Sequence, residues 1–275
     1  MGEGHCRPGA HRPLIFRPRW DILKVPTPKG DEMKPKPLVI TTYSLPAPVR
    51  PRRIALAADL HNGDPAPLFA ALQDASPDMI CLSGDLYEGP PRCPAFAFDH
   101  ATECLRFCAA MAPTFYAPGN HDKTEAPGLR NLLSACGVTY LRDSFVSFED
   151  LLIGGLSSAY YQDDPTPDMA FARRYAAEAG YKILLCHHPE YYRRYLRPAG
   201  LADAFDLILS GHNHGGQWAI GSHGLYVPGQ GLFPPHCAGL FDGRLVVSRG
   251  VCNNVPVPRI GTPPELVLID LFHKQ

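Results

Sequence analysis

Five short segments of this chain carry side chains that often bind metal ions in proteins. They are residues 59–61 (Asp-Leu-His), 84–85 (Gly-Asp), 119–122 (Gly-Asn-His-Asp), 187–188 (His-His) and 211–214 (Gly-His-Asn-His). The set is larger than one structural zinc site requires, and it contains no pair of thiolates. A mixed group of carboxylate, amide and imidazole ligands of this size predicts two adjacent metal ions that catalyse hydrolysis of a phosphate compound.

Buried strands are expected to position these segments. Apolar runs typical of such strands precede four of the five, at residues 54–58, 79–83, 183–186 and 207–210. Open α/β sheets place their sites at the carboxyl ends of neighbouring strands. We therefore expect the segments to converge on one crevice.

The first two segments offer carboxylates beside a turn. Asp59 and His61 lie two residues apart, so on an extended chain they would face the same way. Asp85 follows a glycine that permits close backbone approach, and its two oxygens can bridge two cations. Each of these motifs alone is also typical of an ordinary surface turn.

The segment at residues 119–122 is more specific. Asn120 offers a neutral carbonyl oxygen to a metal ion, and His121 can transfer protons near neutral pH. Asp122 is expected to orient or polarise the imidazole of His121. The segment therefore predicts one metal ligand together with an acid–base group.

The remaining two segments contribute imidazoles. Strand alternation predicts that only one of His187 and His188 faces the site. His212 and His214 lie two residues apart among three glycines, which suits a tight loop that brings the two rings to two different metal ions.

The rest of the chain predicts an α/β fold (α+β by some definitions). Helical spacing or helix-stop signals occur at residues 67–74, 97–111, 129–136 and 168–179, between predicted strands. Residues 140–154 predict a hairpin, and short strands follow residue 214. We expect a four-layer α/β/β/α sandwich of two mixed β-sheets flanked by helices, with the dinuclear metal site at the carboxyl ends of the strands.

Composition limits the partners and the compartment. The 275-residue chain has a formal net charge of −1 and no basic stripe, which disfavours a nuclease and predicts no nucleic-acid partner. Nine cysteines without a C-x-x-C motif predict free thiols in a reducing cytosol. No apolar run is long enough for a transmembrane helix, so we expect a cytoplasmic protein, peripheral at the membrane if its substrate is a lipid.

The chain is expected to form one domain over residues 33–275. Residues 1–32 are rich in Pro, Arg, Gly and Lys and lack periodicity, which predicts a disordered or loosely attached extension. Met33 is a possible true start of translation.

The ordered motifs D-x-H, G-D, G-N-H-D, H-x-P and G-H-x-H over residues 54–214 resemble the calcineurin-like metallophosphoesterase superfamily. The stretches 215–217, 228–234 and 248–250, followed by Pro264-Glu265, resemble its YkuE/YaeI-like branch of small bacterial phosphodiesterases. The resemblance covers about residues 38–272. It implies a metal-dependent hydrolase that acts on phosphomonoesters or phosphodiesters.

The resemblance also implies ligands for two divalent ions bridged by Asp85 and a water or hydroxide. The first ion would take Asp59, His61, Asp85 and His214, and the second would take Asp85, Asn120, His187 and His212. Mixed oxygen and nitrogen ligands without thiolates favour Mn, Fe or Zn. The family's second motif usually ends in Asp, whereas Glu88 stands here, so the surroundings of the ligands are expected to differ at that point.

The implied reaction is in-line attack of the bridging hydroxide on phosphorus, with His121 protonating the leaving oxygen. One alternative is a pyrophosphohydrolase of a nucleotide-linked lipid such as UDP-diacylglucosamine, with Leu232 and Phe233 against an acyl chain. A second alternative, a non-catalytic scaffold that binds other proteins, is disfavoured because every ligand position is filled. The expected substrate is a phosphate-ester small molecule or a lipid-linked phosphate compound.

Overall fold

A computed structural model of the chain describes residues 38–88, 99–122, 129–158, 166–220, 223–227, 230–252 and 259–273. All of these belong to one compact unit, Lys36–Gln275. The expectations for residues 1–32 and for Met33 fall outside the described residues.

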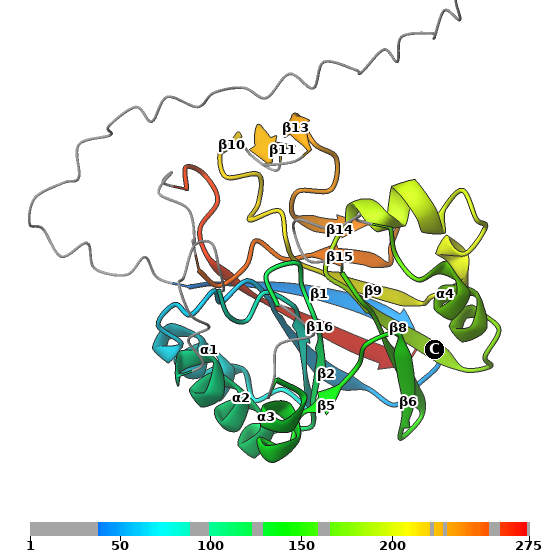
Figure 1. Ribbon diagram of the computed structural model, residues 1–275, viewed down its shortest axis with the longest axis horizontal. Helices are drawn as coiled ribbons and strands as arrows, with labels where there is room; N and C mark the ends of the chain where they lie inside the picture. The colour runs from blue at the N-terminus through cyan, green and yellow to red at the C-terminus, as the bar shows by residue number, and fades with distance from the viewer. Residues whose placement is uncertain are drawn as a thin grey trace, which may run out of the picture. The chain divides into compact units, whose positions relative to one another are not determined.

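Two six-stranded sheets form the centre of this unit (Figure 1). The first sheet contains, in spatial order, β1 (Val39–Ala47), β16 (Glu265–His273), β2 (Arg52–Ala57), β3 (Met79–Ser83), β4 (Thr114–Ala117) and β5 (Thr139–Tyr140). The second contains β14 (Gly239–Phe241), β15 (Leu245–Val247), β9 (Leu207–Ser210), β8 (Tyr181–Cys186), β7 (Leu151–Leu156) and β6 (Ser144–Phe148).

Both sheets are mixed, as expected. The strands β2, β3, β4 and β5 run parallel, whereas β16 is antiparallel to β2 and parallel to β1. In the second sheet β7, β8, β9 and β15 are parallel, and the edge strands β6 and β14 are antiparallel to their neighbours. Both sets of parallel strands end in segments that carry predicted metal ligands.

Helices cover the outer face of each sheet. The first sheet is covered by α1 (Ala66–Ala75), α2 (Asp99–Met111) and α3 (Leu129–Ala135), and the second by α4 (Met169–Ala176), η1 (Tyr192–Leu196) and η2 (Ala202–Ala204) (Figure 1). The alternation of side chains along β2 shows the layers, because Ala55 packs toward the helices whereas Ile54 and Leu56 pack between the sheets. The predicted four-layer sandwich is confirmed.

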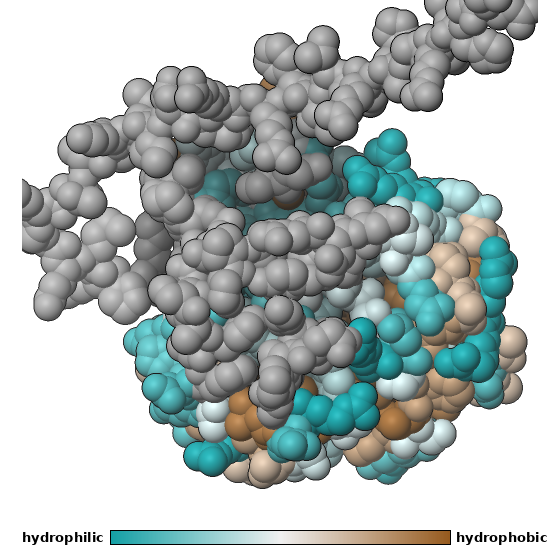
Figure 2. Space-filling view, viewed as in Figure 1, coloured by the Kyte–Doolittle hydropathy of each residue, from teal (hydrophilic) through white to brown (hydrophobic). Residues whose placement is uncertain are grey.

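Four short strands in the second half of the chain lie outside the two large sheets. They pair as two antiparallel ribbons: β10 (Ala219–Ile220) with β11 (His223–Gly224), and β12 (Tyr226–Val227) with β13 (Gly231–Leu232). Among the described helices, none is both long and apolar enough to cross a lipid bilayer. Hydrophilic and hydrophobic residues are interspersed across the described surface that is visible in Figure 2.

Tyr175 of α4 anchors this helix to the second sheet. Its buried hydroxyl has one hydrogen to donate and lies within hydrogen-bonding distance of two carbonyl oxygens, those of Leu152 (2.8 Å) and Ile183 (3.0 Å). We expect Tyr175→Phe to lower the free energy of unfolding by about 1–2 kcal/mol, because the acceptors lose a buried donor. Urea denaturation measures this loss, with the 40% exposed Tyr226, replaced by Phe, as the control. Equal stability of the two variants would contradict the anchoring role.

Candidate metal centre

The predicted ligands converge where the parallel strands of the two sheets end. The turns after β2 and β3 are joined by a hydrogen bond from the amide of Asp59 to the carbonyl oxygen of Gly84 (3.0 Å). Those after β8 and β9 are joined by one from the amide of Gly211 to the carbonyl oxygen of His187 (3.1 Å). The amide of His212 lies 3.1 Å from both carboxylate oxygens of Asp59, which links the two sheets at the site.

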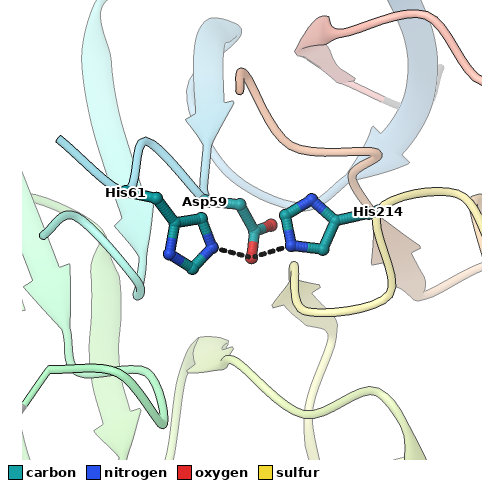
Figure 3. Close-up of side chains that lie close together, drawn as sticks. All are labelled: Asp59, His61 and His214. Atoms are coloured by element: carbon teal, nitrogen blue, oxygen red, sulfur yellow. Dashed lines mark ion pairs between the residues drawn. The ribbon is translucent and has the colours of Figure 1, made fainter. Parts of the chain in front are cut away.

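Asp59 lies between two imidazoles (Figure 3). Its Oδ1 is 3.8 Å from Nε2 of His61 and 3.7 Å from Nε2 of His214. These distances exceed a good hydrogen bond. Donors bound to one ion at about 2.0–2.2 Å each lie about 3–4 Å from one another. The spacing of the three groups therefore fits a shared cation.

Asp85 connects this group to a second one. Its Oδ1 accepts a hydrogen bond from the amide of His121 (2.8 Å). Its Oδ2 lies 3.7 Å from Nε2 of His61 and 3.1 Å from Nε2 of His187. Possible ligand atoms of Asp85, His187 and His212 all lie within 4.8 Å of one another. One carboxylate thus stands between two clusters of ligand atoms.

His187 is oriented by the backbone. Its Nδ1 lies 2.7 Å from the carbonyl oxygen of Ser83, which can only accept, so Nδ1 carries the proton. In the neutral ring Nε2 is then left with its lone pair, 3.1 Å from Oδ1 of Asn120. A metal-binding histidine is commonly held through its other nitrogen in this way.

The backbone at the site adopts conformations that are rare for residues with side chains. Five of the seven predicted ligands have positive φ: Asp59 (58°), His61 (48°), Asp85 (54°), His212 (73°) and His214 (46°). Each such conformation costs about 1–3 kcal/mol and persists only where the surrounding structure enforces it. The argument that Asp59 and His61 face the same way on an extended chain is therefore wrong, although both side chains reach the site.

Close packing also explains a glycine of the last segment. A Cβ added to Gly211 would lie 2.5 Å from the Cβ of Ala58 and 2.7 Å from Oδ2 of Asp59. Only glycine lets the turn after β9 approach the Asp59 carboxylate this closely.

The carboxylates raise the pKa of two of the buried imidazoles. Burial lowers the pKa of His61, but the carboxylates of Asp59 and Glu88 outweigh it and raise the pKa to about 9. Burial likewise lowers the pKa of His187, and the Asp85 carboxylate outweighs it and raises the pKa to about 10. The carboxylates therefore favour positive charge at the position between the rings.

The other two imidazoles have lowered pKa values. Burial lowers the pKa of His214 to about 3 and holds the pKa of His212 well below its usual range. Neutral imidazoles are the form that binds metal ions. Two buried carboxylates, four imidazoles and the Asn120 amide oxygen thus fit divalent cations that prefer mixed oxygen and nitrogen ligands.

The carboxylate against His121 differs from the expected one. Nδ1 of His121 lies 2.6 Å from Oε1 of Glu88, whereas Asp122 accepts hydrogen bonds from the backbone amides of Gly119 (2.8 Å), Asp85 and Leu86 (3.1 Å). The predicted pairing of Asp122 with His121 is wrong. Asp122 has the shorter side chain and instead holds the turns after β3 and β4 together.

Sequence reasoning assigned no partner to two residues of the site. Glu88 places Oε2 3.2 Å from Nδ1 of His61, so its carboxylate contacts two imidazoles. The replacement of the family's usual Asp by Glu88 was the sequence feature that could have indicated this contact. The guanidinium of Arg259 contacts Nδ1 of His214, and no local pattern around Arg259 predicts this.

The structure separates the two adjacent histidines of the fourth segment. His187 reaches Asp85, whereas Nδ1 of His188 lies 3.1 Å from Oε1 of Glu190. Of the pair, only His187 contacts the Asp85 carboxylate, but the His188 ring also borders the site, because it packs against the ring of His212 with centroids 4.1 Å apart. Leu232 and Phe233 are each 72% exposed, on and beside β13.

Comparison with known proteins gives one family and several relatives. The family model described as calcineurin-like phosphoesterase matches residues 52–216, a range that contains all five segments. The uncharacterized protein YpbG of Bacillus subtilis is 27% identical over 209 residues, covering 74% of each chain. Phosphodiesterase YaeI of Escherichia coli is 26% identical over 250 residues, covering 80% of this chain and 82% of YaeI.

The uncharacterized metallophosphoesterase Cj0846 of Campylobacter jejuni is 29% identical over 234 residues. The alignment covers 81% of this chain and 58% of Cj0846, so the chain spans little more than half of that relative.

Proposed function

The chain belongs to the calcineurin-like phosphoesterase family of metal-dependent phosphoester hydrolases, and from that premise we propose that it hydrolyses small phosphodiesters or phosphomonoesters with two metal ions bridged by Asp85. The first ion is assigned to Asp59, His61, Asp85 and His214, and the second to Asp85, Asn120, His187 and His212. The observation that carries the proposal is the position of Asp85 between the two ligand clusters. YaeI, whose alignment covers most of both chains, is named a phosphodiesterase, and this name supports a phosphodiester as the substrate.

The residues around the ions have different roles in the proposed reaction. When bound, the ions supply Lewis acidity and an activated water for in-line attack on phosphorus. Glu88 holds Nδ1 of His121 at 2.6 Å, and we assign the delivery of a proton to the leaving oxygen to the other ring nitrogen, Nε2. Asp122 keeps the turn that carries His121 in place through its backbone hydrogen bonds.

Metal removal tests this function directly. Dialysis against a chelator should abolish hydrolysis, and added Mn²⁺, Fe²⁺ or Zn²⁺ should restore it, because the ligands hold the ions that activate water. The assay panel contains nitrophenyl phosphomonoesters and phosphodiesters, cyclic nucleotides and a nucleotide-linked lipid. Full activity of the metal-free protein, or no hydrolysis of any substrate with all three ions, would overturn the proposal.

A nucleotide-linked lipid is the second candidate substrate. Leu232 and Phe233 are exposed and closely follow Gln230, whose side chain donates a hydrogen bond to Asn213 of the 211–214 segment (2.7 Å). The amide of Phe233 donates to the carbonyl oxygen of Leu225 (3.0 Å). Exposed apolar side chains at such a position favour contact with an acyl chain. Hydrolysis of the lipid-linked pyrophosphate that exceeds hydrolysis of all water-soluble esters would select this candidate.

The proposal includes one domain over residues 33–275 and a cytoplasmic location. Seven cysteines among the described residues are free thiols, six of them buried, which is typical of a reducing compartment. The composition offers no basic stripe for nucleic acid, so small-molecule esters are the proposed partners.

A further inference from the structure

A second polar cluster adjoins the candidate metal centre, and none of the proposed chemistry uses it. It consists of His188, Glu190 and Gln230 around the ring of His212. His188, Glu190 and His212 offer ligand-type atoms within 4.8 Å of one another. Two of these residues follow β8, His212 follows β9, and Gln230 precedes β13. The cluster therefore brings three separate segments of the chain together around His212, one of the predicted metal ligands.

Glu190 is the shared acceptor of this cluster. Its Oε1 lies 3.1 Å from Nδ1 of His188, and its Oε2 accepts a hydrogen bond from Nε2 of Gln230 (3.1 Å). Oε1 also lies 3.9 Å from Nε2 of His212. An ionised carboxylate only accepts hydrogen bonds and has room for several donors, so it suits a position where three nitrogens converge.

The ring of His212 is confined from two sides. The His188 ring packs against it with centroids 4.1 Å apart and is itself stacked on Tyr191 at 4.8 Å, and the His187 ring contacts it edge-on at 5.1 Å. The backbone beside it is held by Asn213, whose amide donates to the carbonyl oxygen of His236 (3.0 Å) and accepts from Gln230 (2.7 Å). Glu190 and Gln230 thus fix both the ring and the loop that carries it.

Nε2 of His212 lies 3.9 Å from Oε1 of Glu190, which is longer than a hydrogen bond, and His212 also belongs to the ligand group of Asp85 and His187. The groups that surround a histidine ligand commonly set the orientation of its ring. We propose that Glu190 is a positioning residue that fixes the His212 ring through the His188 ring, which it holds, and through Gln230, which holds Asn213. This inference rests on the proposed function, because it assumes that His212 binds the second ion.

Metal binding separates this role from a general effect on folding. In Glu190→Gln we expect one of the two ions to bind about 10–100-fold more weakly and the other to bind as in the unchanged protein. The amide of Gln would present a donor where only acceptors fit, so the ring of His212 loses its fixed orientation. Glu178→Gln, at an exposed position beyond α4, is the matched control.

Titration of the metal-free full chain with Mn²⁺ measures both affinities by calorimetry, and electron paramagnetic resonance distinguishes coupled ion pairs from single ions. We expect the coupled signal in the unchanged protein and in Glu178→Gln, and a single-ion signal in Glu190→Gln at the same Mn²⁺ concentration. Higher Mn²⁺ should restore the coupled signal in Glu190→Gln. The thermal midpoint of the metal-free variants should stay equal, which shows that the fold is intact.

Three results would overturn the proposal. Unchanged binding of both ions in Glu190→Gln removes the positioning role, and equal weakening of both ions removes its specificity. Binding of a third ion that depends on Glu190 would make Glu190 a ligand instead. If the unchanged protein binds no ions, the proposed function itself fails, and this outcome is distinct from the other three.

Discussion

Asp85→Asn should abolish hydrolysis and metal binding together. Asp85 is buried, and its Oδ2 stands 3.7 Å from Nε2 of His61 and 3.1 Å from Nε2 of His187, so it serves both ligand clusters. Asparagine keeps the shape and keeps an oxygen for the amide of His121, but it removes the negative charge and the second ligand oxygen. We expect kcat/KM to fall by about 10³-fold or more, equivalent to at least about 4 kcal/mol in the transition state.

The measurement combines steady-state hydrolysis with metal analysis of the purified protein. Asp203→Asn is the matched control, because the side chain of Asp203 is 91% exposed and lies in η2, on the outer face of the second sheet. Both variants lose one carboxylate, so only the position of the charge differs. Asp85→Asn that retains both ions and full activity would show that the bridging assignment is wrong.

His121→Asn should retain both ions and lose turnover in proportion to the difficulty of the leaving group. Its Nδ1 is held by Glu88 at 2.6 Å, as an acid that must be oriented requires. Loss of a positioned acid costs about 10²–10⁴-fold in rate. We expect the full loss with alkyl phosphate esters and a much smaller one with nitrophenyl esters, whose leaving oxygen needs no proton.

Glu88→Gln completes a double-mutant cycle with His121→Asn. If the two residues act as a pair, the double variant assayed at saturating metal concentration should lose little more activity than His121→Asn alone. Glu88→Gln should also weaken metal binding, because Oε2 lies 3.2 Å from Nδ1 of His61. Asp122→Asn is the contrasting variant, which we expect to lower the thermal midpoint without changing the dependence on the leaving group. Additive losses in the cycle, or equal losses with alkyl and nitrophenyl esters, would contradict the pairing.

Local patterns were sufficient for the strands that carry the site. The apolar runs at residues 79–83 and 207–210 match β3 and β9 to the residue, the run at residues 183–186 lies within β8, and the hairpin turn falls at Glu149-Asp150 between β6 and β7. Buried parallel strands are continuous in hydrophobicity and are followed by turns, so both their length and the position of the polar residues after them can be predicted. The metal ligands could therefore be predicted from their positions in the sequence, directly after buried strands.

Contacts between distant segments were not predictable in this way. Periodicity contains no information on which strands pair, so the order of the two sheets followed only from the structure. The direction of a side chain cannot be predicted from strand alternation once the backbone turns left-handed, as it does at Asp59 and Asp85. Glu88 follows β3 and contacts His121, which follows β4. Glu190 follows β8 and lies near His212, which follows β9. Both pairs are brought together only by tertiary packing.

The position of β16 has a consequence for how the site is made during protein synthesis. This strand lies between β1 and β2, and the register pairs Val39 with Glu265 and Ile54 with Ile269. The ribosome therefore synthesises β1 and β2 long before it synthesises β16, the strand that pairs with both. Until β16 emerges, β2 has an open edge, and the turn that holds Asp59 lacks one side of its support. Metal uptake before β16 emerges would meet an unfinished first sheet, so assembly of the centre is expected to follow the synthesis of β16.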